Sequence, residues 1–176
     1  GSINLSDQFN DSSNPFETGS LSGTSAGSFV NGAFGGGATR LWIVNQSVAG
    51  TYQGYIEDSG GRLLALRKSG PATLTMTAAS TYSGGTTVSN GTLLVNNASG
   101  SGTGTGTLTV QTGATLGGTG SIGGVATLES GSTLAPGVSP GTLTFTAGMT
   151  LDAGSALDME MGTSSDLMIG ERVLAI

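Results

Sequence analysis

The segment LALRKSGPATLTMTAASTYSGGTTVSNGTLLVN, residues 64–96, decides the fold that we expect for this chain. It consists of short Thr- and Leu-rich runs separated by Gly-containing turns, a pattern typical of short β-strands. Its closing phrase, Val88–Leu94, returns in altered form in the rest of the chain. A repeated strand–turn–strand phrase is typical of a stack in which each repeat buries its apolar face against the next. Function is therefore to be sought in the stack rather than in a single pocket.

The repeated phrase is an aliphatic or aromatic residue, two spacers, a Gly, two spacers and a Leu. Successive Gly residues lie 22, 18, 17 and 6 positions apart, and the first three distances are close to the length of one solenoid coil. The last distance is too short, so we expect Gly154 to mark a second turn within the coil of Gly148. We expect the apolar residues of the phrase to face inward and to stack between coils. The phrase occurs at Val88/Gly91/Leu94, Val110/Gly113/Leu116, Leu128/Gly131/Leu134, Phe145/Gly148/Leu151 and Leu151/Gly154/Leu157.

The composition narrows the class of protein. The 176 residues include 33 Gly, no Cys and no His, and only 9% of them are charged. Disordered chains combine high charge with few aliphatic residues, whereas 36% of this chain is hydrophobic. The net charge of −6 excludes the dense cationic surface that nucleic-acid binding requires. No apolar run approaches the roughly 18 residues that predict a transmembrane helix.

The pattern predicts an all-β chain that folds as a parallel β-helix, or β-solenoid, with essentially no helix. We expect residues 1–38 to form an N-terminal cap or irregular segment, or else strands of upstream rungs, and residues 39–176 to form the coils. The alternative is an antiparallel β-sandwich, for which Asn90-Gly91 is a typical hairpin turn, although the regular coil spacing disfavours it. Strands are predicted at residues 40–44, 52–56, 62–67, 72–76, 86–88 and 92–95.

Three consecutive phrases of the segment closely resemble the passenger-associated transport repeat of autotransporters. They follow that repeat's order of a Lys-x-Gly phrase, a Thr-Leu strand, a Tyr-x-Gly-Gly-Thr-x-Val phrase and a Gly-Thr-Leu phrase. Pro71-Ala72 departs from the pattern, because the family more often has a small residue and Gly there. The phrases are Leu66–Met76, Thr81–Val88 and Gly91–Val95, and similar flanking phrases at Tyr52–Asp58, Ala114–Gly124 and Leu134–Leu143 extend the resemblance over about residues 52–160.

The resemblance implies a single-stranded right-handed β-helix in the passenger region of a Gram-negative surface protein. The repeat, at about residues 64–96, is expected to support secretion and folding and to carry no catalytic residue. The family implies a C-terminal translocator barrel as a partner and a location that is secreted or at the cell surface, in the outer membrane. We expect that barrel, and the cover for the apolar end at residues 166–176, to lie outside this chain.

No catalytic, cofactor-binding or metal site is predicted, and we expect the chain not to be an enzyme. Without His and Cys it has no Ser-His-Asp triad, no thiol nucleophile and no His/Cys zinc site. Acids near the C-terminus are the best alternative, because carboxylates on adjacent faces would supply oxygen ligands for Ca²⁺. A solvated polar edge is the simpler interpretation. These acids are Asp152, Asp158, Glu160 and Asp166, of which the first two are expected to point outward.

A mixed-charge cluster is a further candidate, because β-helices also host polysaccharide lyases and hydrolases, which need carboxylates and cations on one concave face. Exposed turn charges are the simpler interpretation. A paired-carboxylate glycosidase would hold two acids roughly 5–10 Å apart, which sequence does not place. The cluster comprises Glu57, Asp58, Arg62, Arg67 and Lys68.

Two further groups of residues have a binding interpretation and a simpler one. Trp42, Tyr52 and Tyr55 are candidates for a sugar-stacking patch, although packing within the coils is favoured. Asn45 and Asn97 begin Asn-x-Ser sequons, which matter only in a host that glycosylates them.

Three functions follow from the sequence. The leading hypothesis is a structural passenger segment that acts as a stalk or adhesin body. The second is an adhesin face that binds glycans or other copies of itself through Thr, Ser and Asn ladders. The third is a carbohydrate-active enzyme on the same fold.

Overall fold

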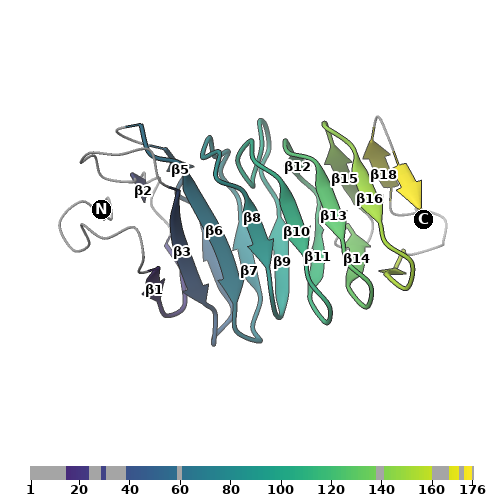
Figure 1. Cartoon of the computed structure of the whole chain (residues 1–176), viewed down its shortest axis with the longest axis horizontal. Helices are drawn as coiled ribbons and strands as arrows, with labels where there is room; N and C mark the ends of the chain where they lie inside the picture. Colours follow the sequence, from purple (N-terminus) through teal and green to yellow (C-terminus); the bar gives the residue numbers. More distant parts are fainter. Residues whose placement is uncertain are drawn as a thin grey trace.

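The computed structural model of the chain is a β-solenoid of about five turns built from parallel strands (Figure 1). The structure describes residues 15–23, 29–30, 39–58, 61–137, 141–159, 167–170 and 173–175. Within these ranges all helical or extended structure is strand, and every pairing between named strands is parallel. The predicted all-β parallel solenoid without helix is therefore confirmed, and an antiparallel sandwich is excluded.

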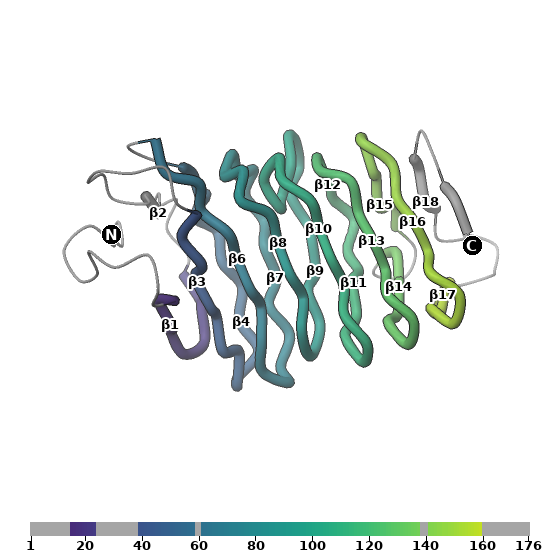
Figure 2. Tube along the Cα trace, in the orientation of Figure 1, coloured from purple at the N-terminus to yellow at the C-terminus, as the bar shows by residue number. Residues whose placement is uncertain are grey.

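Two long sheets form the main faces of the solenoid, and the coils follow one another along its long axis (Figure 2). Two short sheets complete the turns. The eight-stranded sheet has the order β1 (Phe16–Thr18), β3 (Arg40–Asn45), β6 (Leu64–Ser69), β8 (Thr86–Val88), β10 (Leu108–Val110), β13 (Ala126–Leu128), β16 (Met149–Leu151) and β19 (Val173–Ala175). The six-stranded sheet has the order β17 (Ala156–Leu157), β14 (Thr133–Pro136), β11 (Thr115–Gly118), β9 (Thr92–Val95), β7 (Leu74–Met76) and β4 (Gly50–Tyr52). The short sheets are β12 (Ser121–Ile122), β15 (Thr142–Phe145) and β18 (Leu167–Gly170), and β2 (Phe29–Val30) with β5 (Ile56–Glu57).

The strands form because alternate residues face inward and outward, and most of the inward ones are apolar. In β8, β10 and β13 the first and third residues are buried and the central Thr is partly exposed. Register places Val88, Val110 and Leu128 side by side in successive coils. Each such ladder removes apolar surface from water at about 25 cal/mol per Å². A single coil has no partner for its inner face, so each coil is stable only when it is packed against its neighbours.

Gly154 marks a second turn within the coil of Gly148, as predicted, but the predicted equivalence of Gly148 with Gly131 is wrong. Gly113, Gly131 and Gly154 share one corner, because Gly113 N donates to Gly131 O and Gly131 N donates to Gly154 O, each at 2.9 Å. Gly154 is thus the next coil's equivalent of Gly131, whereas Gly148 precedes β16 at a different corner. Register places Val110 and Leu128 18 residues apart but Leu128 and Leu151 23 apart, so coil length is not constant. Phe145 instead pairs with Ile122 in the three-stranded sheet.

One predicted inward residue is also wrong. Leu93, not Leu94, is the register partner of Leu116, and Leu93 is fully buried. Leu94 lies beside Gly117 and is partly exposed. The cause is the eight-to-six corner, the turn by which the chain passes from the eight-stranded to the six-stranded sheet. It is one residue shorter after Val88 than after Val110.

The N-terminal boundary stays partly a prediction. Phe16–Thr18 pairs in parallel with β3, and Leu21 is buried in the core. Much of the predicted 1–38 segment lies outside the described residues, so the predicted start of the coils at residue 39 remains an expectation.

Candidate functional site at the coil corners

Lys68 is a fully buried cation in the segment that first indicated the fold. It lies on β6 in register between Val44 on β3 and Val88 on β8. Its Nζ donates to Gly70 O in its own coil and to Asn90 O in the next coil, each at 2.7 Å. Burial lowers the pKa of Lys68 to about 8. The side chain thus joins two successive eight-to-six corners, so the interpretation of its cluster as exposed turn charges is wrong for Lys68.

Asp58 has a comparable role on another side of the coil. Its Oδ1 accepts from Leu64 N at 2.7 Å, and its Oδ2 accepts from Ser83 N at 3.0 Å and from the Ser83 hydroxyl. Leu64 and Ser83 belong to successive coils. A carboxylate that accepts several hydrogen bonds is a strong structural anchor. The prediction that Asp58 is an exposed turn charge is therefore wrong, because its carboxylate joins two coils.

The Tyr82–Thr86 phrase brings two coils into contact. The Tyr82 hydroxyl is buried and bonded to Thr86 Oγ1 at 2.5 Å, and burial raises the pKa of Tyr82. Gly84 N donates to Leu64 O at 2.9 Å. A Cβ on Gly84 would lie 2.5 Å from that oxygen, so only glycine allows this approach. The motif therefore serves packing between coils.

Buried side-chain amides form hydrogen bonds with backbone groups at other corners, and in the sequence each is only a polar residue next to a turn. Gln46 Oε1 accepts from Leu21 N at 2.8 Å, and its Nε2 donates to Val48 O at 2.8 Å. Asn97 Nδ2 donates to Ser99 O at 2.9 Å, and Asn97 is only 4% exposed. The Asn97 sequon is thus closed to modification in the folded chain. Asn45 is exposed.

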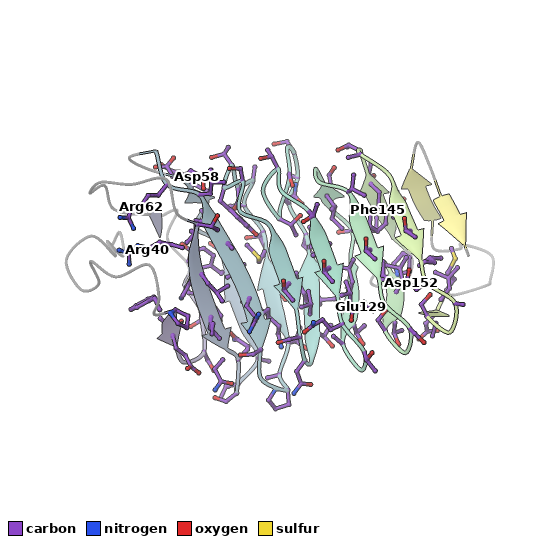
Figure 3. All side chains as sticks on the ribbon, in the orientation of Figure 1. Arg40, Asp58, Arg62, Glu129, Phe145 and Asp152 are labelled. Atoms are coloured by element: carbon purple, nitrogen blue, oxygen red, sulfur yellow. The ribbon has the colours of Figure 1, made fainter. Side chains whose placement is uncertain are left out.

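The predicted acidic cluster is not assembled in the part of the chain that the structure describes. Asp152 lies at the eight-to-six corner after β16, whereas Asp158 follows β17 and is exposed. Asp152 is instead the coil-to-coil neighbour of Glu129, far from Asp58 (Figure 3). Glu160 and Asp166 lie outside the described residues. Among those described, no three His, Cys, Asp or Glu side chains are grouped to hold a metal ion.

The mixed-charge cluster does not share one concave face. Arg67 is exposed on the outer side of β6, whereas Lys68 points inward. Arg62 is buried and lies with Arg40 at the N-terminal end of the solenoid (Figure 3). Burial and the nearby Arg62 lower the pKa of Arg40. Glu57 is half-buried on β5.

The aromatic residues do not form a sugar-stacking patch. Trp42 is fully buried and its Nε1 donates to Thr18 Oγ1 at 3.0 Å. Tyr52 is buried in the same core, and burial raises its pKa. Tyr55 is exposed. Core packing is thus the correct interpretation for Trp42 and Tyr52.

The outer side of the eight-stranded sheet carries a regular ladder of hydroxyl groups, which we call the threonine ladder. It consists of the central residues of four neighbouring strands, which are in register and partly exposed: Thr87, Thr109, Thr127 and Thr150.

Comparison with known proteins identifies the segment that contains these corner contacts. Residues 66–95 match the family model of the passenger-associated transport repeat. The match runs from within β6 to the end of β9 and includes Lys68, Tyr82 and Gly84. No curated protein and no solved structure matches the chain. Among the described residues, no helix is long and apolar enough to cross a membrane.

Proposed function

We propose that this chain, an autotransporter passenger segment that carries a passenger-associated transport repeat, serves as a structural stalk or adhesin body. Its mechanism is folding itself, in which each coil docks on the previous one and so helps to draw the unfolded chain outward. The family implies a secreted or cell-surface protein of a Gram-negative bacterium. Display at the outer membrane, with a translocator barrel as partner, is part of the proposal.

The observation that carries the proposal is that polar groups in and next to the repeat form hydrogen bonds between neighbouring coils. Lys68 bonds to Asn90 of the next coil, and Gly84 N bonds back to Leu64 O of the previous coil. Asp58, just outside the matched segment, joins Leu64 to Ser83. These groups are engaged by the neighbouring coil, as expected where docking is the task of the segment.

The proposal predicts that secretion depends on coil docking. In the full-length protein on living cells, Leu116→Ala removes a fully buried side chain of β11 and should weaken docking by about 2–5 kcal/mol. Thr115→Ala changes the partly exposed neighbour and is the matched control. Pulse-chase labelling with protease added to intact cells measures the rate of surface display. We expect Leu116→Ala to slow display several-fold and Thr115→Ala to leave it unchanged.

Parental display rates for a Leu116→Ala protein that is shown to be less stable in vitro would contradict the proposal. Lower total synthesis is distinguished from slower display by quantifying the chain that stays inside the cell.

A second candidate function is an adhesin face that binds glycans or other copies of this chain, and the threonine ladder favours it. Four uncharged hydroxyl side chains in register offer repeated hydrogen-bonding groups on one sheet face. Aggregation of cells that display the protein, compared with cells that display a Thr109→Lys and Thr127→Lys variant, tests this role.

We propose no enzymatic activity, and turnover of a polysaccharide that is abolished by Asp58→Ala, Asp152→Ala or Asp158→Ala would overturn that view.

A further inference from the structure

Neighbouring coils of this solenoid are so alike that the apolar ladders do not distinguish them. Strand β6 accepts Thr86-Thr87-Val88 as its neighbour, yet Leu108-Thr109-Val110 offers the same outward Thr and inward Val two strands further on. If β10 docked on β6 and the coil of β8 looped out, similar inward side chains would still be buried. Repetitive stacks therefore need a feature that selects the correct neighbour.

Lys68 requires the coil that docks on β6 to supply a hydrogen-bond acceptor for its buried ammonium. Its ammonium is buried and bonds to one carbonyl from its own coil and one from the next. The side chains in register with it, Val44 and Val88, carry no charge. A buried ammonium without these carbonyls is strongly unfavourable, because its desolvation is not compensated. Docking on β6 is therefore favourable only for a corner that places a carbonyl at the position of Asn90 O.

From β3 onward, the eight-to-six corner above Lys68 is the one that differs in length from the others that the structure describes. From the inward residue of the eight-stranded sheet to the aligned residue of the six-stranded sheet, Val88 to Leu93 advances five positions. The equivalent step is six positions in the other coils from β3 to β17: Val44 to Gly50, Lys68 to Leu74, Val110 to Leu116, Leu128 to Leu134 and Leu151 to Leu157. The short corner is the one whose carbonyl receives the buried ammonium.

Gly91 completes the match between the short corner and Lys68. Its φ of +65° is in the left-handed region that favours glycine. A Cβ there would lie 2.6 Å from Lys68 Nζ and 2.6 Å from Gly70 O. The short corner therefore lies directly against the ammonium and the preceding corner, with no room for a side chain.

We propose that Lys68 and the short corner Ser89–Gly91 form a register lock that admits only the coil of β8 and β9 onto the coil of β6 and β7. A six-position corner, such as the one after Val110, adds a residue where the lock has no space. Lys68 acts in this lock as a positioning residue for folding and binds no ligand. The lock concerns the order of coils and does not depend on the proposed role in secretion.

Disulfide reporters test the lock directly, because the chain has no Cys of its own. Arg67 and Thr87 are register partners on the outer face, and neighbouring strands lie about 4.8 Å apart, within reach of a disulfide. Arg67→Cys with Thr87→Cys reports the native order, and Arg67→Cys with Thr109→Cys reports the skipped coil. Each pair is refolded from denaturant under oxidising conditions in three backgrounds: the parent, Lys68→Met and Leu66→Met. Leu66→Met is the matched control, since it changes another buried side chain of β6 at similar volume.

We expect Lys68→Met to raise the yield of the skipped-coil disulfide by about tenfold or more, as loss of a penalty against the wrong neighbour predicts. Leu66→Met should keep the parental ratio of skipped-coil to native disulfide. Insertion of a Gly after Asn90 should lower the native disulfide when Lys68 is present and restore it when Lys68 is replaced by Met. A parental ratio in Lys68→Met, or an equal rise in Leu66→Met, would overturn the lock. Failure of Lys68→Met to fold would also overturn it, because Lys68 would then serve stability rather than register.

Discussion

Lys68 shows how one side chain at an inward position changes the chemistry of a coil. Its register neighbours are Val44 and Val88, so apolar packing surrounds its aliphatic stem. Its ammonium reaches the corner carbonyls of Gly70 and Asn90, as long cationic side chains do when they place the charge at the edge of an apolar region. The same residue is charged in the unfolded chain, where water solvates it fully. Burial therefore connects its protonation to folding.

The pH dependence of stability follows from that connection. Burial lowers the pKa of Lys68 to about 8 from an ordinary value of 10.5. Between these values the folded chain has released the proton while the unfolded chain still holds it, so the free energy of unfolding rises with pH. The neutral amine keeps two N–H donors, one for each carbonyl. Urea midpoints between pH 7 and 10 should therefore rise more in the parent than in Lys68→Met, and parallel pH profiles would contradict this.

At the scale of the strand, β9 shows that inward and outward positions depend on the corner before it. Leu93 is fully buried beside Leu116, whereas Leu94 is partly exposed beside Gly117. A change of one residue in corner length moves every following side chain to the other face of the strand. Leu93 and Leu94 thus contribute differently to stability, although the local sequence does not distinguish them.

Alanine substitution of each leucine distinguishes these roles. Leu93→Ala should lower the free energy of unfolding by about 2–5 kcal/mol, because it leaves a cavity in a packed ladder. Leu94→Ala should cost about 1 kcal/mol or less, because the side chain already contacts solvent. Chemical denaturation of the two variants gives both values. A larger loss for Leu94→Ala would show that the register of β9 is the one expected from the repeat phrase.

For the whole molecule, the coils form a nearly one-dimensional array in which each contacts its immediate neighbours. Strand β10 pairs with β8 on one side and β13 on the other. Strand β17, at the end of the six-stranded sheet, pairs with β14, and its Leu157 is 46% exposed where the equivalent Leu134 is buried. Stability in such arrays is a sum over coils and their junctions, so it should differ along the axis.

Amide hydrogen exchange should reveal this gradient. We expect the amides of β10 and β11 to exchange at least about a hundredfold more slowly than those of β17, because β10 and β11 each pair with a strand on both sides whereas β17 pairs with β14 alone. Mass spectrometry of peptides after timed labelling measures the difference. Equal protection in β10, β11 and β17 would mean that the solenoid opens as a single cooperative unit.

The sequence by itself determined the fold class and the repeat, because short Thr- and Leu-rich strands between glycines leave few ways to bury apolar surface. It also led to the transport-repeat family through the phrases around Lys68, Tyr82 and Gly91. Only the tertiary structure decided the register: coil lengths vary at the corners, so Gly154 rather than Gly148 follows Gly131, and Leu93 rather than Leu94 faces inward. It also decided that Lys68 and Asp58 join coils, since their hydrogen-bond partners lie in coils distant in sequence. Local pattern reports the alternation of side chains, whereas the partners of a buried charge depend on which coil lies beside it.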